Sequence, residues 1–175
     1  DKCFMNTAVV KLKFPDSLTF LGNHAFSNCR ELKTVKLGES LNAIEMSCFA
    51  NCTNLKIVYS ESCKKLDYIG YGAFTNCKSL EKIYFPQSLK KIDTNAFKNT
   101  HALSEAILPK SLDTLGNSAF SWSGITKVFI PDTLKQLPYG VFRNTNLTEV
   151  FIPKDILFVQ HDAFRDCLKL KIYKV

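Results

Sequence analysis

The side chains best suited to nucleophilic catalysis or metal binding in this chain are its seven cysteines and three histidines. A catalytic centre needs a nucleophile, a base and an orienting group in contact, and a zinc site needs ligands that converge from short spacings. His24, His101 and His161 have no Ser, Cys or pair of acids at a recurring distance beside them. Cys48 and Cys52 come nearest to a metal-ligand spacing. We therefore expect no enzyme activity, no metal and no cofactor.

Phenylalanine recurs along the whole chain at intervals of 22 to 25 residues. Aliphatic residues stand eight and five positions before the Phe of each complete repeat, and again five or six positions after it. One such unit cannot bury its own apolar face, so copies must stack on both sides of it. This period, with a Leu-x-x-Ile-x-Leu core, is typical of leucine-rich-repeat solenoids. The phenylalanine column consists of Phe4, Phe26, Phe49, Phe74, Phe97, Phe120, Phe142 and Phe164.

Most of the cysteines occupy fixed positions in this repeat. Cys3 and Cys48 stand directly before Phe, where Ala is usual, and only Cys63 lies outside the pattern. The other four stand three residues after Phe, where Cys alternates with Thr and Ser. Such interchange predicts a small, semi-buried packing position with free thiols rather than disulfides. This position is filled by Thr7, Cys29, Cys52, Cys77, Thr100, Ser123, Thr145 and Cys167.

The sequence pattern of the repeat resembles that of the BspA-like leucine-rich-repeat family, also called the Treponema-type repeat. The clearest carriers are FPDSLTFLGNHAFSNCREL (Phe14–Leu32) and FPQSLKKIDTNAFKNTHAL (Phe85–Leu103), and the resemblance covers essentially the entire chain. It implies an α/β-type, right-handed solenoid with a parallel β-sheet on the concave face and short coil or helical turns on the convex face. The resemblance also implies a surface or secreted protein of the kind found mainly in bacteria and some protists, which acts as an adhesin or host-contact protein, although many members have no assigned role. The family has no catalytic residues to transfer to this chain.

The 175 residues are expected to form one repeat domain of about seven and a half repeats, cut from a longer array. The chain opens within a repeat and stops on a strand, without the polar caps that solenoids need for solubility. Proline or glycine follows most of the expected strands. Proline has no N–H to donate to the neighbouring strand, so it marks the end of a strand. Eight strands are expected: Lys11–Phe14, Thr34–Leu37, Ile57–Ser60, Lys82–Phe85, Glu105–Leu108, Lys127–Ile130, Glu149–Ile152 and Ile172–Val175.

Composition argues against nucleic-acid and membrane partners. The net charge is +7, but the lysines are spread over every repeat, which is typical of a solvated face. Nucleic-acid binding would favour clustered arginines and a recognisable reading module. No apolar run approaches the roughly 20 residues of a membrane span, so membrane insertion is not expected.

The strongest candidate for function is a row of outward-facing residues on the predicted sheet. Strand side chains alternate, so the residue between the two core positions of each strand points outward. That column reads Lys13, Lys36, Tyr59, Tyr84, Ile107, Phe129, Phe151 and Lys174. Tyr59, Tyr84, Ile107, Phe129 and Phe151 would form a partner-binding stripe, with Lys82 and Lys127 in the neighbouring column steering acidic partners towards it. The alternative is a ladder that only shields the sheet, or one covered by another domain.

These features predict a non-enzymatic binding module, the repeat ectodomain of a cell-surface or secreted adhesin-like protein. Its partner would be a protein or glycan on another cell or in the matrix, and end-to-end or sheet-mediated self-association is a further possibility. The alternative is an intracellular repeat scaffold that docks another protein or domain. The unpaired cysteines favour this alternative, because disulfides normally form in oxidising compartments.

Overall fold

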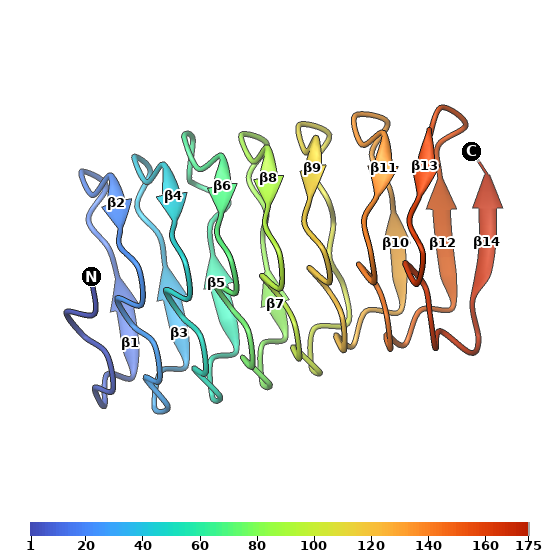
Figure 1. The fold of residues 1–175 in the computed structure, drawn as a ribbon. Helices are drawn as coiled ribbons and strands as arrows, with labels where there is room; N and C mark the ends of the chain where they lie inside the picture. The colour runs from blue at the N-terminus through green and yellow to red at the C-terminus, as the bar shows by residue number, and fades with distance from the viewer. Residues whose placement is uncertain (175) are drawn as a thin grey trace.

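The repeat folds into a solenoid of parallel strands, in which each turn contributes up to two strands followed by a series of tight turns (Figure 1). The computed structural model describes residues 1–174. Strands of successive turns lie side by side in two ladders, and the array runs almost straight across Figure 1. The first ladder contains β1 (Lys11–Lys13), β3 (Thr34–Lys36), β5 (Ile57–Tyr59), β7 (Lys82–Ile83), β10 (Lys127–Phe129), β12 (Glu149–Ile152) and β14 (Lys171–Lys174). The second contains β2 (Phe20–Leu21), β4 (Ala43–Ile44), β6 (Tyr68–Ile69), β8 (Lys91–Ile92), β9 (Thr114–Leu115), β11 (Gln136–Leu137) and β13 (Phe158–Val159).

The first ladder agrees with the expected strands to within one or two residues, with two exceptions. The expected strand Glu105–Leu108 does not form, and only Glu105 makes a bridge, to Lys127. The last strand is Lys171–Lys174 rather than Ile172–Val175, and Val175 lies outside the described residues. The second ladder was not expected, because its strands are only two residues long and carry no recognisable alternation.

The expectation of helical turns and of an α/β-type solenoid is wrong, since residues 1–174 contain no helix. The segment around each column Phe instead places one residue two positions before it and another two positions after it in the left-handed region, with φ between 52° and 63°. An α-helix needs consecutive right-handed residues, so two left-handed residues four positions apart prevent one. Asn and Asp, which tolerate this conformation best, fill most of the later positions: Asn6, Asn28, Asn51, Asn76, Asn99, Asn144 and Asp166, with Trp122 as the exception.

The phenylalanine column forms the centre of the core. Successive rings stack face to face with centroids 5.1 to 5.8 Å apart and planes within 10° of parallel. The rings of Phe49, Phe74, Phe97, Phe120 and Phe142 are completely buried. Aliphatic side chains from both ladders and from the segments between them complete the core, among them Val58, Ile44 and Leu89.

Each ladder is interrupted once, and the two interruptions lie in adjacent turns. The first ladder divides between β7 and Glu105, and the second divides between β9 and β11. In the second ladder, the residue after each strand normally donates its N–H to the turn before, as Gly116 does to Ile92 at 2.8 Å. Pro138 occupies that position after β11 and has no N–H to donate, so the hydrogen bond to Leu115 is missing.

The stacked core leads to a prediction about stability. Replacing Phe97 or Phe74 with Ala should cost about 3–5 kcal/mol, because a large cavity remains between two neighbouring rings. Phe4 is 52% exposed at the end of the array, so Phe4→Ala should cost much less. Urea unfolding of the variants measures the difference, and equal losses at Phe4 and Phe97 would contradict the assignment.

Candidate functional site

The predicted stripe is a continuous outward-facing row on the first ladder. Tyr59 and Phe129 point outward from β5 and β10, and Phe129 is paired in register with Phe151 on β12. Tyr84 and Ile107 continue the line between them, directly after β7 and after the bridge at Glu105. Four of the five are exposed, from 36% for Tyr59 to 81% for Ile107, and Phe151 is half-buried.

The row ends with Tyr173 rather than Lys174. The parallel register pairs Phe151 with Tyr173, because the last repeat is 22 residues long and not 23. The rings of Phe151 and Tyr173 stack with centroids 5.0 Å apart, and those of Phe129 and Phe151 are 4.4 Å apart. We define the aromatic row as Tyr59, Tyr84, Ile107, Phe129, Phe151 and Tyr173. Tyr173 could have been found from the 22-residue spacing alone.

Ile107 divides the aromatic row into two stacks. Tyr59 and Tyr84 are 6.2 Å apart on one side, and the stack that begins with Phe129 lies on the other. A hollow of about 260 Å³ lies between Tyr84 and Ile107, and another of about 220 Å³ lies between Ile107 and Phe129. One ring face of Tyr84 and one of Phe129 are not covered by another ring. Tyr84 lines the first hollow and Phe129 lines the second. The centre of the row is therefore its most exposed part.

A column of alternating charges runs beside the aromatic row. Lys127 lies 2.8 Å from Glu149 (Nζ to Oε2), and its ammonium group is 5.3 and 4.9 Å from the ring centroids of Phe129 and Phe151. Glu149 and two aromatic faces therefore hold this cation in place. Lys82 forms no salt bridge with any of the described residues. The charge column consists of Lys82, Glu105, Lys127, Glu149 and Lys171.

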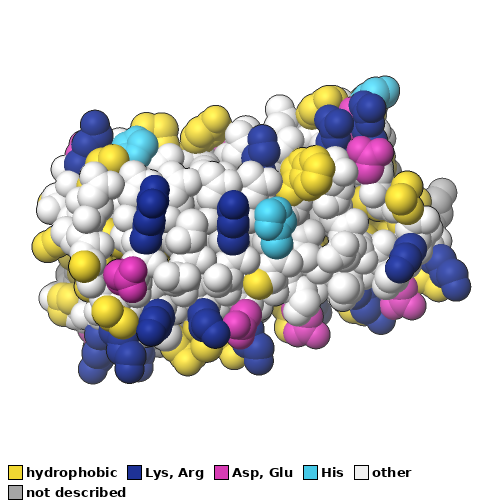
Figure 2. Space-filling view, turned by 90° about the horizontal axis from the view of Figure 1, so that it is seen from below, with side chains coloured by type: hydrophobic (Ala, Val, Ile, Leu, Met, Phe, Trp, Pro, Cys, Tyr) yellow, Lys and Arg dark blue, Asp and Glu magenta, His cyan; other side chains and the backbone are white. Residues whose placement is uncertain are grey.

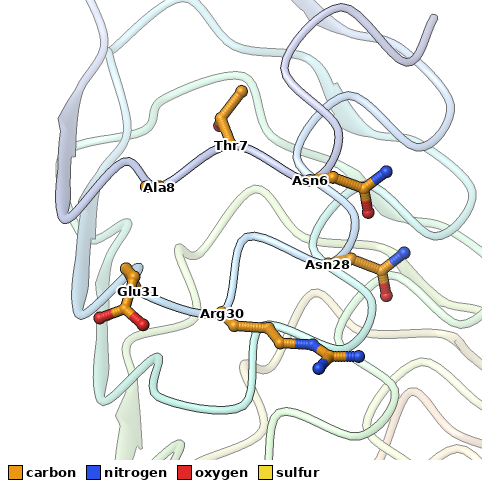
Figure 3. Close-up of a pocket in the computed structure, with 6 residues that line it drawn as sticks. All are labelled: Asn6, Thr7, Ala8, Asn28, Arg30 and Glu31. Carbon is orange, nitrogen blue, oxygen red and sulfur yellow. The ribbon is translucent and has the colours of Figure 1, made fainter.

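The edge formed by the tight turns offers no comparable site. Figure 2 shows Lys and Arg scattered along this face with Asp and Glu among them, as on an ordinary solvated surface. A hollow of about 370 Å³ near the N-terminal end is lined by Asn6, Asn28, Arg30 and Glu31, among others (Figure 3). The charged ends of Arg30 and Glu31 point in opposite directions, so these groups do not converge on a ligand.

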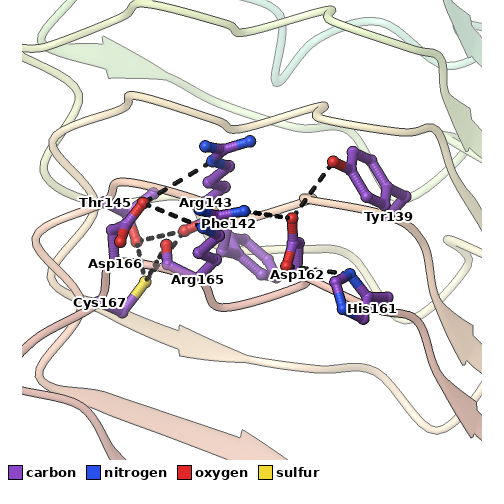
Figure 4. A network of polar contacts seen from close by, with 9 residues as sticks. All are labelled: Tyr139, Phe142, Arg143, Thr145, His161, Asp162, Arg165, Asp166 and Cys167. Carbon is purple, nitrogen blue, oxygen red and sulfur yellow. Dashed lines mark hydrogen bonds and ion pairs between the residues drawn. The ribbon is translucent and has the colours of Figure 1, made fainter.

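A polar cluster near the C-terminal end has a structural role (Figure 4). The carboxylate of Asp162 accepts hydrogen bonds from Tyr139 Oη and Arg165 Nη1, both at 3.2 Å, and lies 3.0 Å from Nδ1 of His161. Burial opposes ionisation of Asp162, but the hydrogen bond from Arg165 and the nearby imidazole outweigh it and lower the pKa of the carboxyl group. The cluster joins two successive turns, and its charges compensate one another.

The cysteines are free and mostly buried, as the interchange with Thr and Ser predicted. Cys52 Sγ donates to the carbonyl oxygen of Phe26 in the preceding turn at 3.1 Å, and Cys77 makes the same contact with Phe49. Burial raises the pKa of Cys52 to about 12 and that of Cys63 to about 11. Across residues 1–174, no group of three or more His, Cys, Asp or Glu side chains is placed to hold a metal ion.

The same part of the chain contains no helix that could span a membrane.

Comparison with known proteins places this geometry in context. A family model described as BspA type Leucine rich repeat region (6 copies) matches residues 1–67 and 57–171. A leucine-rich repeat protein of T. pallidum is 26% identical and superposes with a TM-score of 0.84, over 93% of this chain and 78% of that chain. A leucine-rich repeat protein from Bacteroides ovatus ATCC 8483 is 25% identical with a TM-score of 0.59, over 95% of this chain and 55% of that chain.

A leucine rich cell surface protein from Faecalibacterium prausnitzii A2-165 has the same fold, with 24% identity and a TM-score of 0.54, over 94% of this chain and 53% of that chain. The chain thus spans about half the length of the B. ovatus and F. prausnitzii proteins. Comparison with curated protein sequences found no match.

The environment of the thiols leads to a prediction about reactivity. In the folded protein, Cys52 and Cys77 should resist alkylation by iodoacetamide at neutral pH, because burial keeps them protonated and out of reach. The exposed Cys3 should react readily and serves as the internal control. Mass spectrometry of the alkylated protein reports both outcomes. A disulfide between Cys29 and Cys52, found without reductant, would contradict the packing role.

Proposed function

The chain belongs to the BspA-type leucine-rich repeat family, whose model matches nearly its whole length, and from that premise we propose that it is a non-enzymatic protein-binding module. The binding surface is the aromatic row, with the charge column along its side. Long repeat arrays present extended surfaces of this kind to macromolecular partners.

The observation that carries the proposal is the exposure of the aromatic row. Stacking of the turns requires apolar residues at the inward positions, but it places no such demand on the outward column. Cross-strand aromatic pairs do stabilise a sheet, by about 0.2–1 kcal/mol each. That contribution does not account for Ile107, which is 81% exposed and has a hollow on each side. Contiguous apolar surface of this kind marks interaction sites, and aromatic residues are enriched in their hot spots.

We further propose that the chain is the ectodomain of a cell-surface or secreted protein, and that it contacts other cells or the matrix. The support is its family and the F. prausnitzii protein of the same fold, which is described as a cell surface protein. The aromatic row would bind the partner through apolar contact, and Lys82 would accelerate association with acidic partners in a salt-dependent way.

The free cysteines favour a second candidate, an intracellular scaffold that docks another protein through the same row. All seven thiols are unpaired, which suits a reducing compartment. The full-length protein distinguishes the candidates, because a secretory leader supports the ectodomain and contradicts the intracellular scaffold.

The proposal predicts the effect of removing two rings. The double variant Tyr84→Ser/Phe129→Ser should bind its partner at least tenfold more weakly, which corresponds to about 1.4 kcal/mol, while the fold is retained. The measurement is a binding titration against the matrix proteins that the parent protein captures in a screen, with unfolding followed in parallel. Phe20→Ser is the control, because Phe20 and Phe129 are both 58% exposed but Phe20 lies in the second ladder. Unchanged binding, or unfolding of the double variant, would show that the row is structural.

A further inference from the structure

We propose that the partner that fits the aromatic row is a second copy of this chain, packed face to face in an antiparallel dimer. The inference rests on the proposed function, because it assigns an occupant to the same surface. It depends on the order of residues in the aromatic row and in the charge column, which together make the surface complementary to itself.

The geometry of the dimer follows from a twofold axis parallel to the strands, midway between the turns of Ile107 and Phe129. This axis reverses the order of the turns but keeps each column opposite the same column of the other copy. Ile107 then faces Phe129, Tyr84 faces Phe151 and Tyr59 faces Tyr173. Every outward position of the row from β5 to β14 thereby meets an aliphatic or aromatic residue, and the hollows between Ile107 and Phe129 of the two copies face each other across the axis.

The charge column becomes complementary under the same axis. Reversal about the centre places Lys82 opposite Glu149 and Glu105 opposite Lys127, so the four facing pairs that these residues make join unlike charges, while Lys171 faces Ile57. A shift by one turn would place Lys82 opposite Lys127 and the two Glu105 side chains opposite each other. Like charges in such an interface are strongly unfavourable. Of the registers that oppose unlike charges at the centre, the proposed one pairs all six turns of the aromatic row with one another.

The size of the surface indicates a weak, reversible dimer. Six turns at about 4.8 Å each extend for about 29 Å. A strip of that length and one strand wide buries roughly 1,000 Å² over both copies, at the lower end of specific interfaces. Two sheets can pack in this way at a separation of about 10 Å, and the nearly straight array in Figure 1 keeps the row accessible along its length.

Sedimentation velocity of the intact protein tests whether the dimer forms. Over roughly 1–300 μM we expect a concentration-dependent shift from monomer to dimer. Tyr84→Ser/Phe129→Ser should remain monomeric over the same range, whereas Phe20→Ser should dimerise like the parent. A parent protein that stays monomeric at the highest concentration overturns the proposal, as does a double variant that dimerises normally.

Charge inversion tests the register. The quadruple variant Lys82→Glu/Glu105→Lys/Lys127→Glu/Glu149→Lys inverts both members of each charged facing pair, so it should still form dimers with itself. It should not form mixed dimers with the parent, because the four facing pairs at these positions would then carry like charges. Native mass spectrometry of an isotope-labelled parent mixed with the inverted variant reports both species. Mixed dimers at the statistical proportion would overturn the antiparallel register.

The outcomes of these experiments distinguish a failure of the dimer proposal from a failure of the proposed function. If the parent is monomeric but the double variant loses binding to a matrix protein, the aromatic row is a binding surface whose partner is not a second copy. If the parent dimerises through the row and captures no matrix protein, the self-association stands and the proposed contact with the matrix does not.

Discussion

The structure depends on one spacing, which is the distance at which hydrogen bonds hold one turn of backbone against the next. Parallel strands in a sheet lie about 4.8 Å apart. The stacked rings of the phenylalanine column, 5.1 to 5.8 Å apart, fit that spacing with a small tilt or offset. A thiol or hydroxyl three residues later contacts a backbone carbonyl, as Cys52 and Thr100 do. Because every turn must satisfy the same spacing, each inward position accepts a narrow set of side chains. Only the outward positions are free to vary for another purpose.

The sequence predicted the features that apolar periodicity specifies and missed the recurring features that it does not. The phenylalanine core, the small position of the cysteines and the first ladder follow from apolar residues at fixed spacings. The second ladder could not be predicted, because strands of two residues carry no alternating pattern. Helical turns were expected from the family resemblance, but residues such as Asn51 and Ser47 adopt the left-handed conformation, which no apolar periodicity reveals.

The aromatic row was predicted residue by residue from strand alternation, apart from its last member, because a 22-residue spacing was taken as 23. Its shape could not be predicted. The stack is divided at Ile107, since the first ladder is interrupted there and a branched aliphatic side chain replaces a ring. The exposed centre of the candidate site is therefore produced by an irregularity of the repeat. Regular turns supply the flat surface around it.

The two ladder interruptions also affect where the array can bend. The turn between them is hydrogen-bonded to the N-terminal half through β9 and to the C-terminal half through Glu105, so it belongs fully to neither. Across this turn the edge of tight turns remains continuous, with Phe97 donating to Ala119 and Phe120 to Val141. At each interface of this turn, the edge of tight turns and one of the two ladders are kept, and the other ladder is interrupted. With one ladder fewer at each of its interfaces, this turn is where we expect the array to bend most easily.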